Sequence, residues 1–287
     1  MKTAIMTDTN SGISVDEGRS LGIYVIPMPV IIDDQDFLEH VNITHQQTYE
    51  AILAGKDVRT SQPSPDTLIN TWKDILKKDG YDAVVYIPMS SGLSNSCETA
   101  LAFARDFDGK VQVVDNHRIS VTLRQSVLEA KDMADAGKDA KEIRRHLEKT
   151  GGESSIYIAV NTLDLLKKNG RATPAAAALS AVFNIKPILT IQGGKLDAFA
   201  KVRGIKHCES RICKAVQDDV NNRFSDIEPS HLYIGAAGTF QHQEDADHWL
   251  ATVRENFPDC NTFYDPLSCS IACHVSVDAI GIGICYR

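Results

Sequence analysis

The chain has 287 residues, a formal net charge of −8 and a sequence pI of about 5.6. Its length suggests about two domains, and its apolar fraction of 43% is enough to bury a core without crosslinks. The acidic balance argues against nucleic-acid binding and against adsorption to an anionic membrane surface, because both need clustered Lys and Arg side chains.

In the first half, short apolar runs alternate with helical patterns. Strands are predicted at 3–8, 23–32, 82–89 and 111–115, and helices at 66–78 and 118–136. The second strand is expected to break at its prolines. Continuous apolar strands are typical of a parallel sheet that is covered on both faces. We therefore expect an N-terminal parallel α/β domain over residues 1–152, ending near Gly151-Gly152.

The second half is richer in strands. Residues 205–224 form the clearest helical pattern, with Cys208 on its buried stripe, and "GGKLDAF" predicts a hairpin turn. A C-terminal α+β domain with a mixed sheet is therefore expected over residues 153–287. Its strands are predicted at 154–160, 185–191, 196–204, 231–238 and 279–287.

No segment approaches the ~20 apolar residues of a membrane span, and the N-terminus turns polar too early for a signal peptide. The seven cysteines are odd in number and suggest no disulfide framework. These features predict a cytoplasmic protein with reduced cysteines and no stable membrane insertion.

Three loops rich in hydroxyl groups follow or precede these elements: "TDTNSG" after the first strand, "RTSQPSP" at 59–65 and "SSGLSNS" at 90–96. Parallel sheets bind ligands beyond the carboxyl ends of their strands. Each loop alone is explained by helix capping. Together they favour an anion site at helix N-termini, although neither GxxxxGK[ST] nor GxGxxG occurs there.

A nucleophilic serine is the competing interpretation. "GLSNS" at 92–96 nearly matches the G-x-S-x-G elbow of α/β hydrolases, and Ser94, Asp265 and His274 stand in the required chain order. However, Ser96 replaces the closing glycine, and no HGGG-type oxyanion loop precedes it. A serine hydrolase of lipid esters that uses Ser94 and His274 is therefore kept as the alternative function.

Metal binding has weaker support in the sequence. "CSIACH" at 269–274 offers two cysteines and a histidine, but no partner pair at zinc-finger spacing. "HQEDADH" at 242–248 is typical of an acidic helix start that leads to a buried Trp249. The sequence alone therefore predicts no metal site and no cofactor.

Several stretches together resemble the DegV family of bacterial fatty-acid-binding proteins over nearly the whole chain. The most specific are "TSQPSP" and "YIPMSSGLSNS", about thirty residues apart. Others are "TDTNSGIS", "VIPMPV", "VNIT", "VQVVDNHRIS", "LDLLKKNGRAT", "FNIKPILTIQGGKL", "KVRG" and the histidine before "AIGIGI".

The resemblance implies a two-domain DegV-like fold with a fatty acid buried between the domains. The tail would occupy an apolar tunnel, and Ser/Thr hydroxyls and a histidine would hold the carboxylate. In several relatives the protein presents this carboxylate to a separate fatty-acid kinase. The implied role is a non-catalytic carrier whose ligand is a long-chain fatty acid such as palmitate.

Carried over residue by residue, Thr60 and Ser61 would hold the carboxylate, with Ser91 and the Gly92 backbone opposite. Ser94 belongs to the same loop and is counted with them.

Further along the chain, His274 resembles the family's C-terminal histidine, and Arg171 in "NGRAT" resembles an arginine near the head group. Arg203 in "KVRG" is a candidate for docking of a kinase.

The chemistry of such a site is consistent. An isolated buried carboxylate needs charge-assisted hydrogen bonds, which hydroxyls and an imidazole can donate. Burial of the tail contributes about 0.8 kcal/mol per CH2 group, so a chain of about 16 carbons supplies most of the affinity.

One departure from the family pattern concerns Ser276-Val277-Asp278, which stand where relatives commonly have Gly-Pro-Gly. Glycines there permit unusual backbone angles, and Asp278 would repel an anionic head group if it faced the pocket. A smaller departure is Thr9 in place of the usual serine. The Ala-rich stretch at 175–183 is a candidate tunnel wall, with ordinary core packing as the alternative.

Overall fold

A computed structural model describes residues 2–178 and 185–287 of the chain. The first large sheet has four parallel strands in the order β2-β1-β6-β7. Its strands are β1 (Thr3–Asp8), β2 (Tyr24–Ile26), β6 (Ala83–Ile87) and β7 (Val111–Val113). The helices of this part are α1 (Val15–Leu21), α3 (Pro65–Lys77), α4 (Ser96–Ala104), α5 (Ser120–Asp135) and α6 (Ala140–Thr150).

The parallel sheet is covered on both faces, as its apolar strands predict. Ile5 and Val85 lie in the core with α5 and α6 on one face. Met6 and Val84 point to the other face, where Trp72 of α3 is buried. Successive residues of each strand therefore enter different cores, and this explains the continuous apolar runs.

The second large sheet has six strands in the order β10-β9-β8-β13-β11-β12. All its pairings are antiparallel except that of β11 with β12. Its strands are β8 (Ser154–Ala159), β9 (Ile185–Ile191), β10 (Leu196–Arg203), β11 (Leu232–Gly238), β12 (Asn261–Pro266) and β13 (Ile280–Tyr286). The mixed sheet and the β9–β10 hairpin are thus confirmed, while β12 is a strand that the sequence analysis missed.

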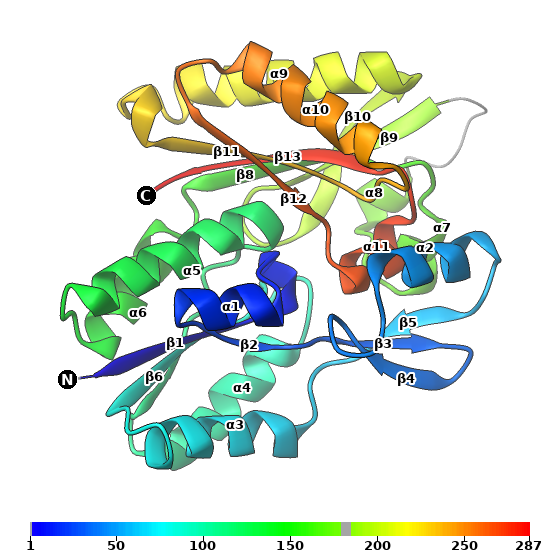
Figure 1. The fold of residues 1–287 in the computed structure, drawn as a ribbon. Helices are drawn as coiled ribbons and strands as arrows, with labels where there is room; N and C mark the ends of the chain where they lie inside the picture. The colour runs from blue at the N-terminus through cyan, green and yellow to red at the C-terminus, as the bar shows by residue number, and fades with distance from the viewer. Residues whose placement is uncertain (1, 179–184) are drawn as a thin grey trace.

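The six-stranded sheet packs between helices. Figure 1 shows α9 (Ile205–Asn222) and α10 (Gln243–Asn256) above it and α5 between the two large sheets. Cys208 of α9 and Trp249 of α10 are buried in the core between these helices and the sheet, as predicted. Gly235 and Gly283 let α5 approach the sheet closely, because a Cβ atom at either would lie within 2.5 Å of the Val121 side chain. The same helix therefore joins both large sheets.

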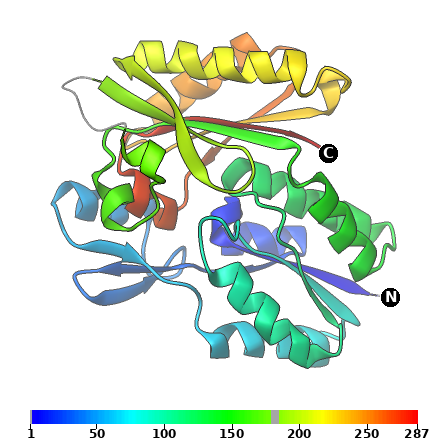
Figure 2. The same ribbon diagram turned by 180° about the vertical axis from the view of Figure 1, so that it is seen from behind.

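A small antiparallel sheet, β4-β3-β5, was not predicted. It consists of β3 (Pro29–Ile32), β4 (Gln35–Leu38) and β5 (Val58–Thr60), with α2 (His45–Leu53) beside it. The predicted strand at 23–32 does break at its prolines, and its two parts join different sheets. Figure 2 shows the late helix α11 (Cys269–Val275) against this early sheet, and α11 contacts β3, β5 and α2.

The remaining helical segments are short: α7 (Asp164–Lys168), α8 (Pro174–Ala177) and the 3-10 turns η1 (Thr9–Ser11), η2 (Arg105–Phe107) and η3 (Pro229–His231). Gly151-Gly152 lie between the end of α6 and the start of β8. The division into domains at 1–152 and 153–287 stays a prediction. None of the helices in the described part of the chain is long and apolar enough to cross a membrane.

Candidate functional site

A cavity of about 320 Å³ lies where the two large sheets and the small sheet meet. Residues of the first half enter from the turn after β1, the end of β5, the turn after β6 and the start of α5. Strands β8, β9, β11 and β13 and helix α11 supply the other wall. The apolar lining includes Met28, Met89, Leu93, Ile119, Val121, Ile156, Ile158, Leu166, Ile191, Leu196, Ala237, Leu267, Ile271, Val275 and Ile282. Such a mostly apolar cavity with a few polar groups is typical of a small-molecule site.

Five of the seven predicted site residues line this cavity: Thr60, Ser61, Ser94, Arg171 and His274. Thr60 is the last residue of β5, and His274 lies in the last turn of α11. The Thr60 Oγ1 and His274 Nε2 atoms are 3.0 Å apart, although the residues are 214 positions apart in the chain. The packing of α11 on the small sheet creates this pair.

The imidazole of His274 has spare hydrogen-bonding capacity. Its Nδ1 atom is buried and has no hydrogen-bond partner among the described residues. Burial, together with the charge of Arg171, lowers the pKa of His274 to about 4. The ring is therefore neutral at pH 7, and one of its nitrogens is free to serve a ligand in the cavity.

Ser61 and Ser94 come from two of the three hydroxyl-rich loops, and their hydroxyl groups differ in the hydrogen bonds that they already make. Ser94 Oγ accepts a hydrogen bond from the Ser96 backbone N–H at 3.2 Å, so its own proton remains free to donate. Ser61 Oγ donates to the Gln62 carbonyl over 3.3 Å, near the limit of a hydrogen bond. Both serines therefore combine a local turn contact with a position on the cavity wall.

Ser91 and Gly92 do not line this cavity. They line a shallower neighbouring pocket that also contains Ser94, Arg171 and Lys195. The Gly92 N–H donates to Ser90 Oγ at 3.1 Å, and a Cβ atom on Gly92 would lie 2.1 Å from the Gly194 carbonyl oxygen. Glycine is thus needed here for close contact with the β9–β10 hairpin. The roles of Ser91 and Gly92 in binding a carboxylate remain untested expectations.

Five polar residues of the cavity wall were not predicted as site residues: Asn10, Gln62, Asn95, Ser120 and Ser270. Asn10 belongs to the hydroxyl-rich loop after β1, so that loop already carried a signal for it. Its side-chain oxygen accepts hydrogen bonds from Ser268, at 2.9 Å, and from Ser270. Ser120 and Ser270 lie in helices, where a serine has no distinguishing pattern.

The loop after β1 is otherwise occupied with internal contacts. The buried Asp8 carboxylate accepts hydrogen bonds from the backbone N–H groups of Asn10 and Met89, at 2.9 and 3.0 Å. Burial raises the pKa of Asp8 to about 6, although these bonds oppose the shift. Asp8 thus connects the ends of β1 and β6 and fixes one rim of the cavity.

The hydrolase alternative gains no support from this geometry. In the described part of the chain, no hydrogen bond joins His274 to Ser94 or to Asp265. Asp265 instead lies beside Arg124, with Oδ2 and Nε 3.3 Å apart. A catalytic serine needs a base within hydrogen-bond reach that is itself oriented by a third group.

The positions that depart from the family pattern face away from this cavity. Asp278 is exposed, its carboxylate contacts the Gln241 side chain, and it does not line the cavity. Ser276 has φ 67° and ψ −172°, and Asp278 has φ 57°. Both angles lie where glycine is favoured.

Arg203, the candidate docking residue, does not line the cavity and is exposed at the end of β10. Most of the stretch at 175–183, the candidate tunnel wall, lies outside the described residues.

Comparison with known proteins agrees with these observations. A DegV domain-containing protein of Deinococcus radiodurans is 29% identical over 289 residues, covering 99% of this chain and 98% of that protein. A DegV family protein of Thermus thermophilus, whose structure is described as fatty acid binding, has a TM-score of 0.88 at 24% identity, and both chains are covered completely. DegV of Bacillus subtilis, described as a fatty acid binding protein, has a TM-score of 0.86 at 23% identity, again over the whole of both chains. The family model of the DegV proteins, which describes them as uncharacterised, matches residues 2–287, and the chain therefore belongs to the DegV family.

Proposed function

We propose that this protein binds a long-chain fatty acid in the cavity, without catalysing a reaction on it. The observation that carries the proposal is the Thr60–His274 pair, with its free imidazole nitrogen, at the polar part of an otherwise apolar cavity. The apolar wall suits an acyl tail. The binding proteins of similar fold from Thermus thermophilus and Bacillus subtilis support the choice of ligand.

In this proposal the hydroxyls of Thr60, Ser61 and Ser94 and the ring of His274 hold the carboxylate. Thr60 and the neutral His274 share one hydrogen bond, so this pair offers the carboxylate one further donor, either the Thr60 hydroxyl or the imidazole N–H. Such neutral donors place no full positive charge against the head group. Arg171, which is exposed and donates to the Asn169 carbonyl, contributes a more distant charge. The carboxylate would therefore stay ionised and chemically accessible.

We further propose that the protein is a carrier that presents this carboxylate to a fatty-acid kinase. The shallow pocket beside the cavity shares Ser94 and Arg171 with it and supports this role, because a partner could reach the head group there. Arg203 is retained as a candidate docking residue. A purified kinase that forms acyl phosphate only when the loaded protein is added would support the role, and equal turnover of free fatty acid would contradict it.

The fatty-acid proposal is tested by denaturing extraction of the purified protein followed by lipid mass spectrometry. We expect about one fatty acid per chain. An empty extract, together with no uptake of added palmitate, would contradict the proposal.

Substitutions then locate the head group. Thr60→Ala combined with Ser61→Ala should weaken palmitate binding by about 1–3 kcal/mol, because charge-assisted hydrogen bonds are lost. Ser210→Ala combined with Thr252→Ala is a matched control on the exposed faces of α9 and α10. Equal affinities for the two double variants would show that the head group lies elsewhere.

A further inference from the structure

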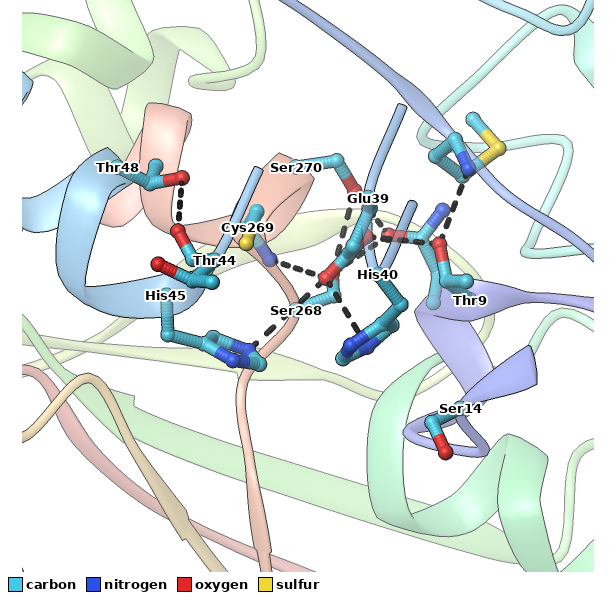
Figure 3. A network of polar contacts seen from close by, with 12 residues as sticks. Thr9, Ser14, Glu39, His40, Thr44, His45, Thr48, Ser268, Cys269 and Ser270 are labelled. Atoms are coloured by element: carbon cyan, nitrogen blue, oxygen red, sulfur yellow. Dashed lines mark hydrogen bonds and ion pairs between the residues drawn. The ribbon is translucent and has the colours of Figure 1, made fainter. Parts of the chain in front are cut away.

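A second polar cluster lies at the start of α11, and none of its four residues, Glu39, His40, His45 and Cys269, lines the cavity. Figure 3 shows the side chains of His40 and His45 directed toward the carboxylate of Glu39, with Cys269 beside them. Glu39 follows β4, His45 is the first residue of α2, and Cys269 is the first residue of α11. Two segments that are distant in the sequence, residues 39–45 and the start of α11, therefore bring an oxygen, a nitrogen and a sulfur donor together.

The donor atoms are close enough to share an ion. One ligand atom each from Glu39, His45 and Cys269 lies within 4.8 Å of the others. The Nε2 atoms of His40 and His45 are 3.8 and 3.9 Å from Glu39 Oε1. In a tetrahedral zinc site the ligand atoms are about 3.3–3.6 Å apart, so the side chains need to move by only about 1 Å.

The hydrogen bonds within the cluster leave lone pairs on Glu39 and His45 that are free to bind a metal ion. Glu39 accepts from Thr9 Oγ1 at 2.7 Å and from the Cys269 backbone N–H at 2.5 Å, which holds the carboxylate in place and leaves lone pairs on both oxygens. His45 Nε2 is buried and has no hydrogen-bond partner in the described residues. The contacts of 3.8 and 3.9 Å are too long to count as hydrogen bonds.

Charge and access also favour an ion. Glu39 is completely buried, and within the described ranges no Lys or Arg pairs with it. Buried carboxylates are usually paired with a cation or bound to a metal. The side chains of His40 and His45 are 28% and 25% exposed, so the cluster lies close to the surface of the protein.

We propose that Glu39, His45 and Cys269 bind a divalent transition-metal ion of the zinc class, with His40 as the fourth donor. A mixed set of imidazole, thiolate and carboxylate ligands suits Zn²⁺ and not Mg²⁺ or Ca²⁺, which take oxygen ligands. Cys269 binds as the thiolate and releases its proton to solvent. This site is independent of the proposed fatty-acid site, and its ion would join the starts of α2 and α11.

The test uses Co²⁺ as a spectroscopic probe on the full chain after dialysis against a chelator. We expect one equivalent to bind, with visible bands typical of four-coordinate cobalt and a thiolate-to-cobalt charge-transfer band. Added Zn²⁺ should displace it stoichiometrically and raise the melting temperature. No saturable binding of either ion would overturn the proposal and leave the cluster as a hydrogen-bonded part of the core.

Variants assign the ligands. Cys269→Ser should abolish the charge-transfer band, while Cys273→Ser, a matched change one helical turn later, should retain it. His45→Gln should lower the Co²⁺ affinity at least tenfold, and its partly exposed position makes it suitable if Cys269→Ser does not fold. A spectrum unchanged by both Cys269→Ser and His45→Gln would place the ion elsewhere and overturn the assignment.

Discussion

The turn after β1 is rich in polar side chains, and so is the mouth of the cavity, which consists of Thr60, Ser61, Ser94 and His274. The two regions differ in how many of their donor and acceptor atoms have no hydrogen-bond partner. In the turn, Asp8 receives two backbone N–H groups, and Ser11 Oγ donates to the Asp8 carbonyl at 2.9 Å. At the mouth, by contrast, the Nδ1 atom of His274 has no partner among the residues described.

This difference in unsatisfied hydrogen-bonding groups offers a way to distinguish hydroxyl-rich loops that stabilise the fold from those that bind a ligand. Composition is nearly the same in both, and helix or turn capping occurs in both. What distinguishes them is the number of donors and acceptors that the folded protein leaves unused beside a cavity. We therefore propose a mainly structural role for the turn and a mainly ligand-binding role for the mouth.

The most severe test of the comparison is Asp8→Ala. The change leaves two buried N–H groups without an acceptor and should lower the free energy of unfolding by about 3 kcal/mol. Urea denaturation with an unchanged m value measures it. Asp8→Asn keeps one acceptor oxygen and should lose less than half as much. The comparison breaks if Asp8→Ala leaves stability unchanged but abolishes palmitate binding.

The pH dependence of His274 gives the next largest effect. Burial lowers its pKa from 6.5 to about 4, so the unfolded chain binds the proton more readily than the folded one between these values. Stability is therefore lost as the pH falls. From pH 7 to pH 5 this group should remove about 2 kcal/mol from the free energy of unfolding of the ligand-free protein.

His274→Gln isolates this contribution, because Asp8, whose pKa is raised to about 6, changes stability in the opposite direction over the same range. The difference in unfolding free energy between wild type and variant should thus change by about 2 kcal/mol between pH 7 and pH 5. Parallel pH profiles for the two proteins would mean that His274 is not held neutral by its surroundings.

The smallest expected effect concerns the backbone at Ser276, two residues after His274 in the chain. Ser276 has φ 67° and ψ −172°, a conformation adopted almost only by glycine. Ser276→Gly should therefore raise the free energy of unfolding by about 1 kcal/mol, as measured by thermal or urea unfolding. Asp278→Gly is the control and should gain less, because Asp tolerates its left-handed conformation and contacts Gln241. Destabilisation by Ser276→Gly would show that the serine side chain matters more than the strain.

The sequence predicted the parallel sheet and most of the mixed sheet well, because buried strands carry continuous apolar runs. It missed β12, whose side chains are mostly exposed or half-buried and give no apolar run. It also missed the small sheet, whose three strands have three or four residues each. Strands of this length are defined by their partners and not by their own pattern.

The candidate site was only partly predictable from residue chemistry. The hydroxyl loops were recognisable from their position after strands, whereas the pairing of Thr60 with His274 came from the family resemblance. The cluster of Glu39, His45 and Cys269 had no signal, because its ligands do not occur at the spacing of a known motif. The sequence showed two cysteines and a histidine at 269–274, but only the fold brings Cys269 to Glu39.

Helix α11 has a consequence for the order in which the protein is made. It is synthesised long after the small sheet on which it packs, which is complete by residue 60, and it supplies His274 to the cavity wall. The parallel sheet, complete by residue 113, has its own core and can form while translation continues. The cavity, however, lacks part of its wall until α11 and β13, which both line it, have left the ribosome. A nascent chain that lacks these elements therefore cannot enclose a ligand in this cavity.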